Sequence, residues 1–238
     1  EMSDKWTLSI GGGYTDGEKD VFWRASSYPE YAQNERLTLA AALLPNKAAK
    51  EWSSFDPKVT LTYNLENSGI IYATYSTGFK SGGYNAPTRQ GGEALEPEEI
   101  MMIELGYKAD LTDRLRLTSS FFMYDYEDLQ VTRAAVGTGT VTTENAADSE
   151  VMGADFDLTW LVSDSLTLRF GGEILDAEYE DFETGSRVAN TILTGDPDAV
   201  GYGLRFFNAK GHSLLRAADS SFFLAANYES GPISVNVN

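Results

Sequence analysis

Glycine and lysine occur together in one run of this 238-residue sequence, GFKSGGYN, from Gly78 to Asn85. A phosphate-binding loop has this kind of composition, but the run lacks P-loop spacing and no helix pattern follows it. We therefore place the run at the end of a strand, where its glycines allow a tight change of direction. Lys80 remains a candidate contact for a phosphate group.

Closely spaced carboxylates form two further candidate sites. The cluster from Asp176 to Glu183 offers the ligands that Ca²⁺ prefers, but its spacing differs from an EF-hand loop, so solvated loop charges are the favoured alternative. Asp155 and Asp157 are two residues apart and share one side of a strand. This geometry could serve glycoside hydrolysis, or the two residues could simply line a polar face.

Nucleophilic and redox chemistry has little support. There is no cysteine, and the single His212 lies apart from any G-x-S-x-G pattern. Tyr84 and Arg89 could contact a ligand by stacking or charge-assisted hydrogen bonds, although no motif singles them out. We predict that the protein is not an enzyme. We assign no catalytic, cofactor-binding or metal-binding residue, and the ligand-binding residues stay unknown.

The net charge of −18 argues against binding to nucleic acid phosphates. Carboxylates concentrate between Asp125 and Glu150 and between Glu173 and Arg187, which we interpret as solvated rims or loops. No apolar stretch approaches the ~20 residues of a membrane-spanning helix. The residues from Glu1 to Trp6 show no signal peptide, so we expect either that it was cleaved or that the chain begins within a longer protein.

Alternation of apolar and polar residues predicts an antiparallel all-β fold of about nine strands. The alternation lies in residues 6–10, 59–65, 101–107, 115–123, 156–162, 166–174 and 222–228, and two further strands are expected at Ile70 to Phe79 and in a last apolar stretch from Ile233.

The predicted connections differ systematically in length. Short links at Glu66–Ser68, Asp110–Asp113, Ser163–Ser165 and Glu229–Pro232 alternate with long polar links at Thr15–Ser54, Lys80–Glu96, Thr132–Asp148 and Asp181–Leu215. Short turns at one end and long loops at the other are typical of an outer-membrane β-barrel. Aromatic residues near segment ends would form its interfacial girdles: Trp6, Tyr124, Tyr126, Tyr179 and Tyr228.

Several motifs occur in the order expected for one family. Phe55 to Asn85 (FDPKVTLTYNLENSGIIYATYSTGFKSGGYN) resembles the mid-barrel hairpin of TonB-dependent receptors, and Leu95 to Val131 (LEPEEIMMIELGYKADLTDRLRLTSSFFMYDYEDLQV) resembles the next hairpin. The segments WTLSIGGGYTDGEKD, GADFDLTW and LTLRFGGEILDAEYEDF also match. Together they cover a little over half of the chain.

The resemblance implies an active importer in the outer membrane of a Gram-negative bacterium. Such a receptor is a ~22-stranded barrel filled by a plug and energised through TonB. A ferric siderophore is the commonest ligand, while cobalamin and oligosaccharides stay open. Its surroundings would be outer-membrane lipid and lipopolysaccharide. Contact of Lys80 with lipopolysaccharide phosphate is then one alternative for the glycine-rich run, and a tight change of direction at the membrane surface is the favoured one.

About nine strands cannot make the whole barrel of this family. We find no plug domain, no TonB-contacting segment near Glu1 and no terminal strand ending in an aromatic residue, so residues 1–238 are expected to be part of a single barrel domain. TonB would then be reached through the missing plug region. Two alternatives are a passive porin-like channel without plug or TonB, and a soluble β-sandwich binding module.

Overall fold

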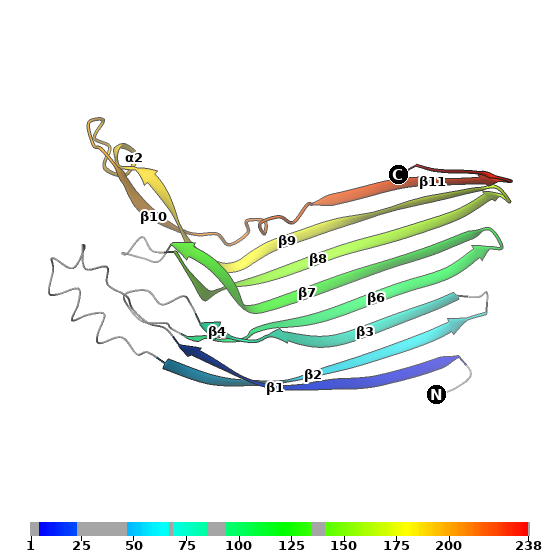
Figure 1. Cartoon of the computed structure of the whole chain (residues 1–238), viewed down its shortest axis with the longest axis horizontal. Helices are drawn as coiled ribbons and strands as arrows, with labels where there is room; N and C mark the ends of the chain where they lie inside the picture. The colour runs from blue at the N-terminus through cyan, green and yellow to red at the C-terminus, as the bar shows by residue number, and fades with distance from the viewer. Residues whose placement is uncertain (1–4, 23–46, 67–68, 85–93, 135–140, 238) are drawn as a thin grey trace.

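The computed structural model consists almost entirely of antiparallel strands (Figure 1). It describes residues 5–22, 47–66, 69–84, 94–134 and 141–237. Ten strands form one sheet in the order β1-β2-β3-β6-β7-β8-β9-β11-β12, with β10 paired to β9, and β4 and β5 form a small second sheet. The nine strands of the main path confirm the predicted number, while β10 was not predicted.

The strands and the single helix in the described part of the chain have the following bounds: β1 Trp6–Phe22, β2 Lys47–Leu65, β3 Gly69–Lys80, β4 Gly83–Tyr84, β5 Ala94–Leu95, β6 Glu98–Thr112, β7 Leu115–Ala134, β8 Val141–Ser163, β9 Leu166–Ala189, α2 Asn190–Thr194, β10 Tyr202–Asn208, β11 Ser220–Ser230 and β12 Ile233–Val237.

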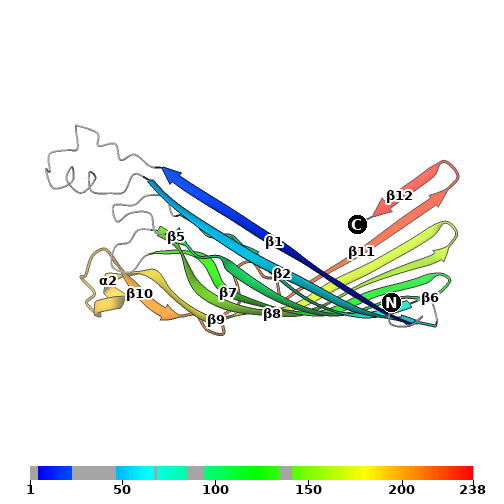
Figure 2. The same ribbon diagram turned by 90° about the horizontal axis from the view of Figure 1, so that it is seen from below.

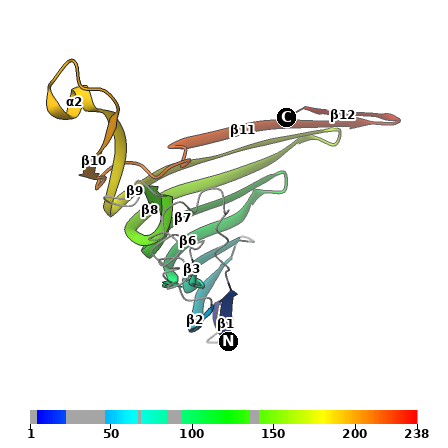
Figure 3. The same ribbon diagram turned by 60° about the vertical axis from the view of Figure 1, so that its left-hand side comes forward.

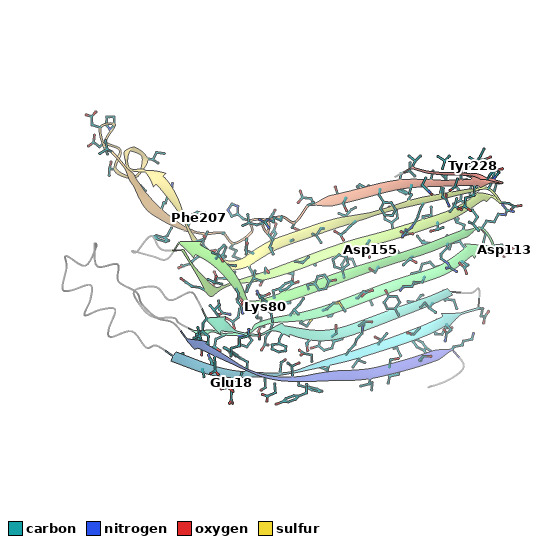
Figure 4. All side chains as sticks on the ribbon, in the orientation of Figure 1. Glu18, Lys80, Asp113, Asp155, Phe207 and Tyr228 are labelled. Atoms are coloured by element: carbon teal, nitrogen blue, oxygen red, sulfur yellow. The ribbon has the colours of Figure 1, made fainter. Side chains whose placement is uncertain are left out.

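The sheet has two distinct ends (Figure 4). The strand ends that flank the predicted short links lie at the end marked by Asp113 and Tyr228, here called the turn end. Those that flank the predicted long links lie at the end marked by Glu18 and Lys80, the loop end, and residues 23–46, 67–68, 85–93 and 135–140 of the links lie outside the described residues. The predicted sorting of links is confirmed, but the predicted long loops are partly wrong. β1, β2, β7, β8 and β9 continue far into them, because backbone pairing with a neighbouring strand can form a ladder where the sequence lacks apolar alternation.

The register gathers the alternating apolar residues on one face. Ile10 is opposite Val59, Val59 opposite Tyr75, and Tyr75 opposite Ile103, and the same parity continues through the remaining strands. The sheet is curved like a trough, with β5 inside it (Figure 2). The apolar set lies on the convex side, since Trp52, which has the opposite parity, is close to the inner segment at Gly82.

The convex face has the dimensions of a membrane-facing band. On β1 this band runs from Trp6 to Tyr14, within the ~9–11 residues that a tilted spanning strand needs. The rings of Trp6 and Tyr63 lie 4.7 Å apart at its turn end. The predicted girdle position is wrong for three residues, because the register turns Tyr124, Tyr126 and Tyr179 toward the concave side.

Aromatic rings lie over glycines of neighbouring strands. A Cβ at Gly153 would meet the ring of Phe122, and one at Gly106 would meet the ring of Tyr72. The same relation joins Gly171 to Phe223 on the concave face and Gly172 to Phe222 on the convex face. Each ring fills the space that a missing side chain leaves and thereby supports the cross-strand register.

β2 and β3 separate before either strand ends. Their pairing stops at Lys58 and Ser76, whereas β2 stays paired with β1 as far as Lys47. Pro57 follows directly beyond the last pair and has no backbone N–H to donate to a ladder. Beyond this point, the β1–β2 hairpin is a two-stranded ribbon.

A projecting arm completes the loop end (Figure 3). It is formed by the end of β9, α2 and β10, and its base holds a small buried cluster of Ala147, Tyr179, Phe182 and Ala209. No helix of the described residues is long and apolar enough to cross a membrane.

Candidate functional site

The concave face is a polar wall whose side chains bond across the strands. Thr60 and Thr74 share a hydrogen bond of 3.0 Å, Tyr72 donates to Glu104, and Ser120 donates to Asp155. Each of these pairs joins residues at or near the same level of neighbouring strands. The concave face is therefore lined by hydroxyls and carboxylates that are held in place by cross-strand hydrogen bonds.

Two arginines on the wall form two-pronged ion pairs nearer the turn end. Arg169 donates to both carboxylate oxygens of Asp157, at 2.6 and 3.2 Å. Arg116 bonds both oxygens of Asp110 in the same two-pronged way, at 2.6 and 3.1 Å. Asp155 and Asp157 share one face, as predicted, but both have neutral or basic partners. Their surroundings are those of structural wall residues.

A short segment crosses the inside of the wall at the loop end. It consists of Ser81–Tyr84 and Ala94–Pro97, here called the strap, and contains the paired strands β4 and β5. Figure 2 shows β5 inside the trough, between β2 and β7.

Two amide side chains hold one side of the strap. Asn145 of β8 donates to the carbonyl oxygens of Glu96 at 3.0 Å and Asp128 at 2.8 Å, while its Oδ1 accepts from the N–H of Glu96 at 2.9 Å. Gln130 of β7 donates to the carbonyl of Glu96 at 2.9 Å, and its backbone N–H donates to the carboxylate of Glu98. Burial, together with the negative charge of the same carboxylate, raises the pKa of Tyr126.

Trp52 of β2 holds the other side of the strap. Its side chain is buried against Gly82, where any Cβ would overlap the indole ring, and the ring of Tyr84 packs against it edge-on at 6.3 Å. The ammonium groups of Lys19 and Lys50 lie 5.7 and 5.8 Å from the ring centroid, within cation–π range. Both lysines also bond the strap directly.

The glycine-rich run lies where the sequence placed it, at a strand end. β3 ends at Lys80, and Gly82 and Gly83 belong to the strap. Positive φ angles are found among the described residues, but not at these glycines. Glycine is required at position 82 because a Cβ there would overlap the ring of Trp52. Lys80 faces the concave side and pairs with Glu98 at 3.1 Å. This inward orientation contradicts the alternative contact with lipopolysaccharide, which would lie against the convex side.

The acidic runs lie mainly on strand ends rather than in loops. Asp125, Glu150 and Glu178 are opposite one another on β7, β8 and β9, on the convex side just beyond the apolar band. No group of three or more potential metal-ligating side chains within the described ranges could hold a metal ion. His212 is exposed, with its backbone paired to Tyr179, and Arg89 lies outside the described residues.

Sequence reasoning did not single out the residues that fix the strap. Asn145 lies in a polar stretch without alternation, and Lys19 and Lys50 were assigned to a long loop. Only Tyr84 was named as a candidate contact. The contact of Trp52 with Gly82 joins β2 to the segment between β3 and β4, which no local motif connects, so only the assembled structure reveals it.

Comparison with known proteins places this geometry in context. Residues 1–237 match the family model described as TonB dependent receptor-like, beta-barrel. The sequence is 26% identical over 186 residues to the probable TonB-dependent siderophore receptor PiuA of Acinetobacter baumannii, a match covering 75% of this chain and 22% of the relative. The chain thus spans about a fifth of the length of that curated relative.

Two solved structures share the fold. The ferric yersiniabactin uptake receptor FyuA of Yersinia pestis superposes with a TM-score of 0.68 at 14% identity, over 95% of this chain and 29% of that one. The ferric-catecholate import receptor Fiu of E. coli K12 superposes with a TM-score of 0.60 at 16% identity, over 99% of this chain and 32% of that one. At these identities the likeness concerns the fold alone.

Proposed function

Because the chain belongs to the TonB-dependent receptor-like β-barrel family, we propose that it is part of the barrel wall of a receptor that imports a ferric siderophore through the outer membrane of a Gram-negative bacterium. Residues 1–238 would belong to a single barrel domain. Import would be energised by TonB, through a plug region supplied by the rest of the protein.

One observation carries this proposal: the register separates a continuous apolar convex face from a polar, hydrogen-bonded concave face. Outward apolar and inward polar residues are the arrangement of a membrane barrel with a hydrated interior. The soluble β-sandwich alternative would need two sheets packed face to face, whereas the main strands here form one curved sheet.

The ligand class rests on the relatives. The names of PiuA, FyuA and Fiu refer to siderophore, ferric yersiniabactin and ferric catecholate transport, and each is a protein distinct from this one. We extend the ferric chelate to this chain as its proposed substrate. Outer-membrane lipid and lipopolysaccharide would contact its convex face.

The proposal is tested by iron uptake into cells that express the full-length protein as their sole receptor for a supplied ferric siderophore. We expect iron starvation to raise its abundance in purified outer membranes, and uptake to stop in cells that lack TonB. A passive porin-like channel would keep its uptake without TonB. Absence of the protein from the outer-membrane fraction would refute the membrane location itself.

A further inference from the structure

Two lysines face each other across β1 and β2 at the loop end of the concave wall. Lys19 and Lys50 are directly opposite in the register, a position in which like charges repel. Lys50 is neutralised by Glu96 of the strap. Lys19 donates instead to two neutral oxygens, the hydroxyl of Ser81 at 2.7 Å and the carbonyl of Gly82. The carboxylates of the adjacent Glu18 and Glu51 belong to the opposite face of the ribbon.

A buried donor lies next to these two cations. The indole Nε1 of Trp52 has no hydrogen-bond partner, although the side chain is only 7% exposed. A buried N–H without an acceptor destabilises the folded protein, so a ligand oxygen that accepted a hydrogen bond from it would bind favourably. Gly82 of the strap covers this atom, since a Cβ there would lie 2.6 Å from it.

We propose that Lys19, Lys50 and Trp52 form an anion-binding site on the inner wall, for the carboxylate or catecholate oxygens of a metal chelate. An anion arriving at the loop end replaces Ser81 and Gly82 as the partner of Lys19. Displacement of Gly82 also frees the indole N–H to donate to the same anion. The site rests on the proposed function and narrows its substrate to chelates with negative charge, in a chain whose net charge is −18.

The test uses the purified full-length protein in detergent and two iron complexes of opposite charge. Ferric tris-catecholate is the anionic probe and ferrioxamine B is the cationic one, and binding is measured by equilibrium dialysis. Lys19→Ala and Trp52→Phe are compared with Lys19→Arg, which keeps the charge. Lys58→Ala is the matched control, because this exposed lysine lies on the same face of β2 outside the cluster.

We expect Lys19→Ala to weaken binding of the anionic complex by about tenfold or more. Trp52→Phe should weaken it less, and Lys19→Arg and Lys58→Ala should leave it near the wild-type value. Heat-modified electrophoretic mobility checks that each variant has a folded barrel.

Equal losses for both complexes, an unchanged affinity in Lys19→Ala, or wild-type protein that prefers the cationic complex or binds neither would overturn the site. TonB-dependent uptake of a cationic or neutral chelate would leave the proposed function intact while refuting this inference. Anion binding by purified protein without uptake in cells would do the reverse.

Discussion

Replacement of Gly82 by alanine should displace the strap. The new Cβ would lie 2.5 Å from Cε2 of Trp52, and closer still to the carbonyl oxygen of Leu95. Ordinary contact begins at 3.4 Å, so the indole must retreat by the difference, about 0.9 Å. The backbone oxygen of Leu95 must move further still, which opens the β4–β5 pairing. Overpacking of this kind costs about 1–3 kcal/mol. The strap gives way more readily than the long β2 ladder, because β4 and β5 contribute only two residue pairs.

The assay is acrylamide quenching of tryptophan fluorescence, with Trp52→Phe identifying the contribution of the buried indole. Gly82→Ala should raise the quenching of that component toward the value of an exposed tryptophan. Gly83→Ala provides the control, because nothing lies within 4 Å of a Cβ at the adjacent glycine. Equal quenching in the two variants, or no change in Gly82→Ala, would refute the packing argument.

Three further changes test the wall and its faces. Asn145→Ala removes the side-chain bonds that join β8 to the strap, and should speed proteolytic cleavage there severalfold without abolishing folding. Leu105→Arg puts a charge in the apolar convex band and should destabilise the folded barrel by about 2–4 kcal/mol in urea titrations in lipid, whereas Thr118→Arg on the concave face should cost far less. Arg169→Ala breaks an exposed ion pair with Asp157, so the same titration should show almost no change.

The sequence predicted the strands well where apolar and polar residues alternate along a paired strand. Residues 59–65 and 101–107 alternate because one side faces an apolar environment, and the register confirms that their apolar sets share a face. Apolar alternation stops predicting strands between the apolar band and the loop end. There β8 starts at Val141 and passes through polar residues such as Asn145, whose strand conformation comes from pairing with β7.

The candidate site was less accessible to prediction. Gly82, Trp52 and Lys19 are far apart in the sequence, and none carries a local signal of contact with the others. The side of the sheet to which Tyr124 and Tyr126 point was also not predictable from local sequence. Their position near a segment end indicated a membrane girdle, but parity within β7 turns them inward. Composition near a boundary therefore cannot replace the register.

The early separation of β2 from β3 has a consequence for local stability. Beyond Pro57 the β1–β2 ribbon has a neighbouring strand on neither side within the described chain, and isolated two-stranded ribbons are marginally stable in water. Its amide protons should exchange with solvent sooner than those of β6 and β7, as a separate cooperative unit. Trp52, Lys19 and Lys50 connect this unit to the strap. Displacement of the strap should therefore change the rate of amide exchange first along residues 14–22 and 47–56.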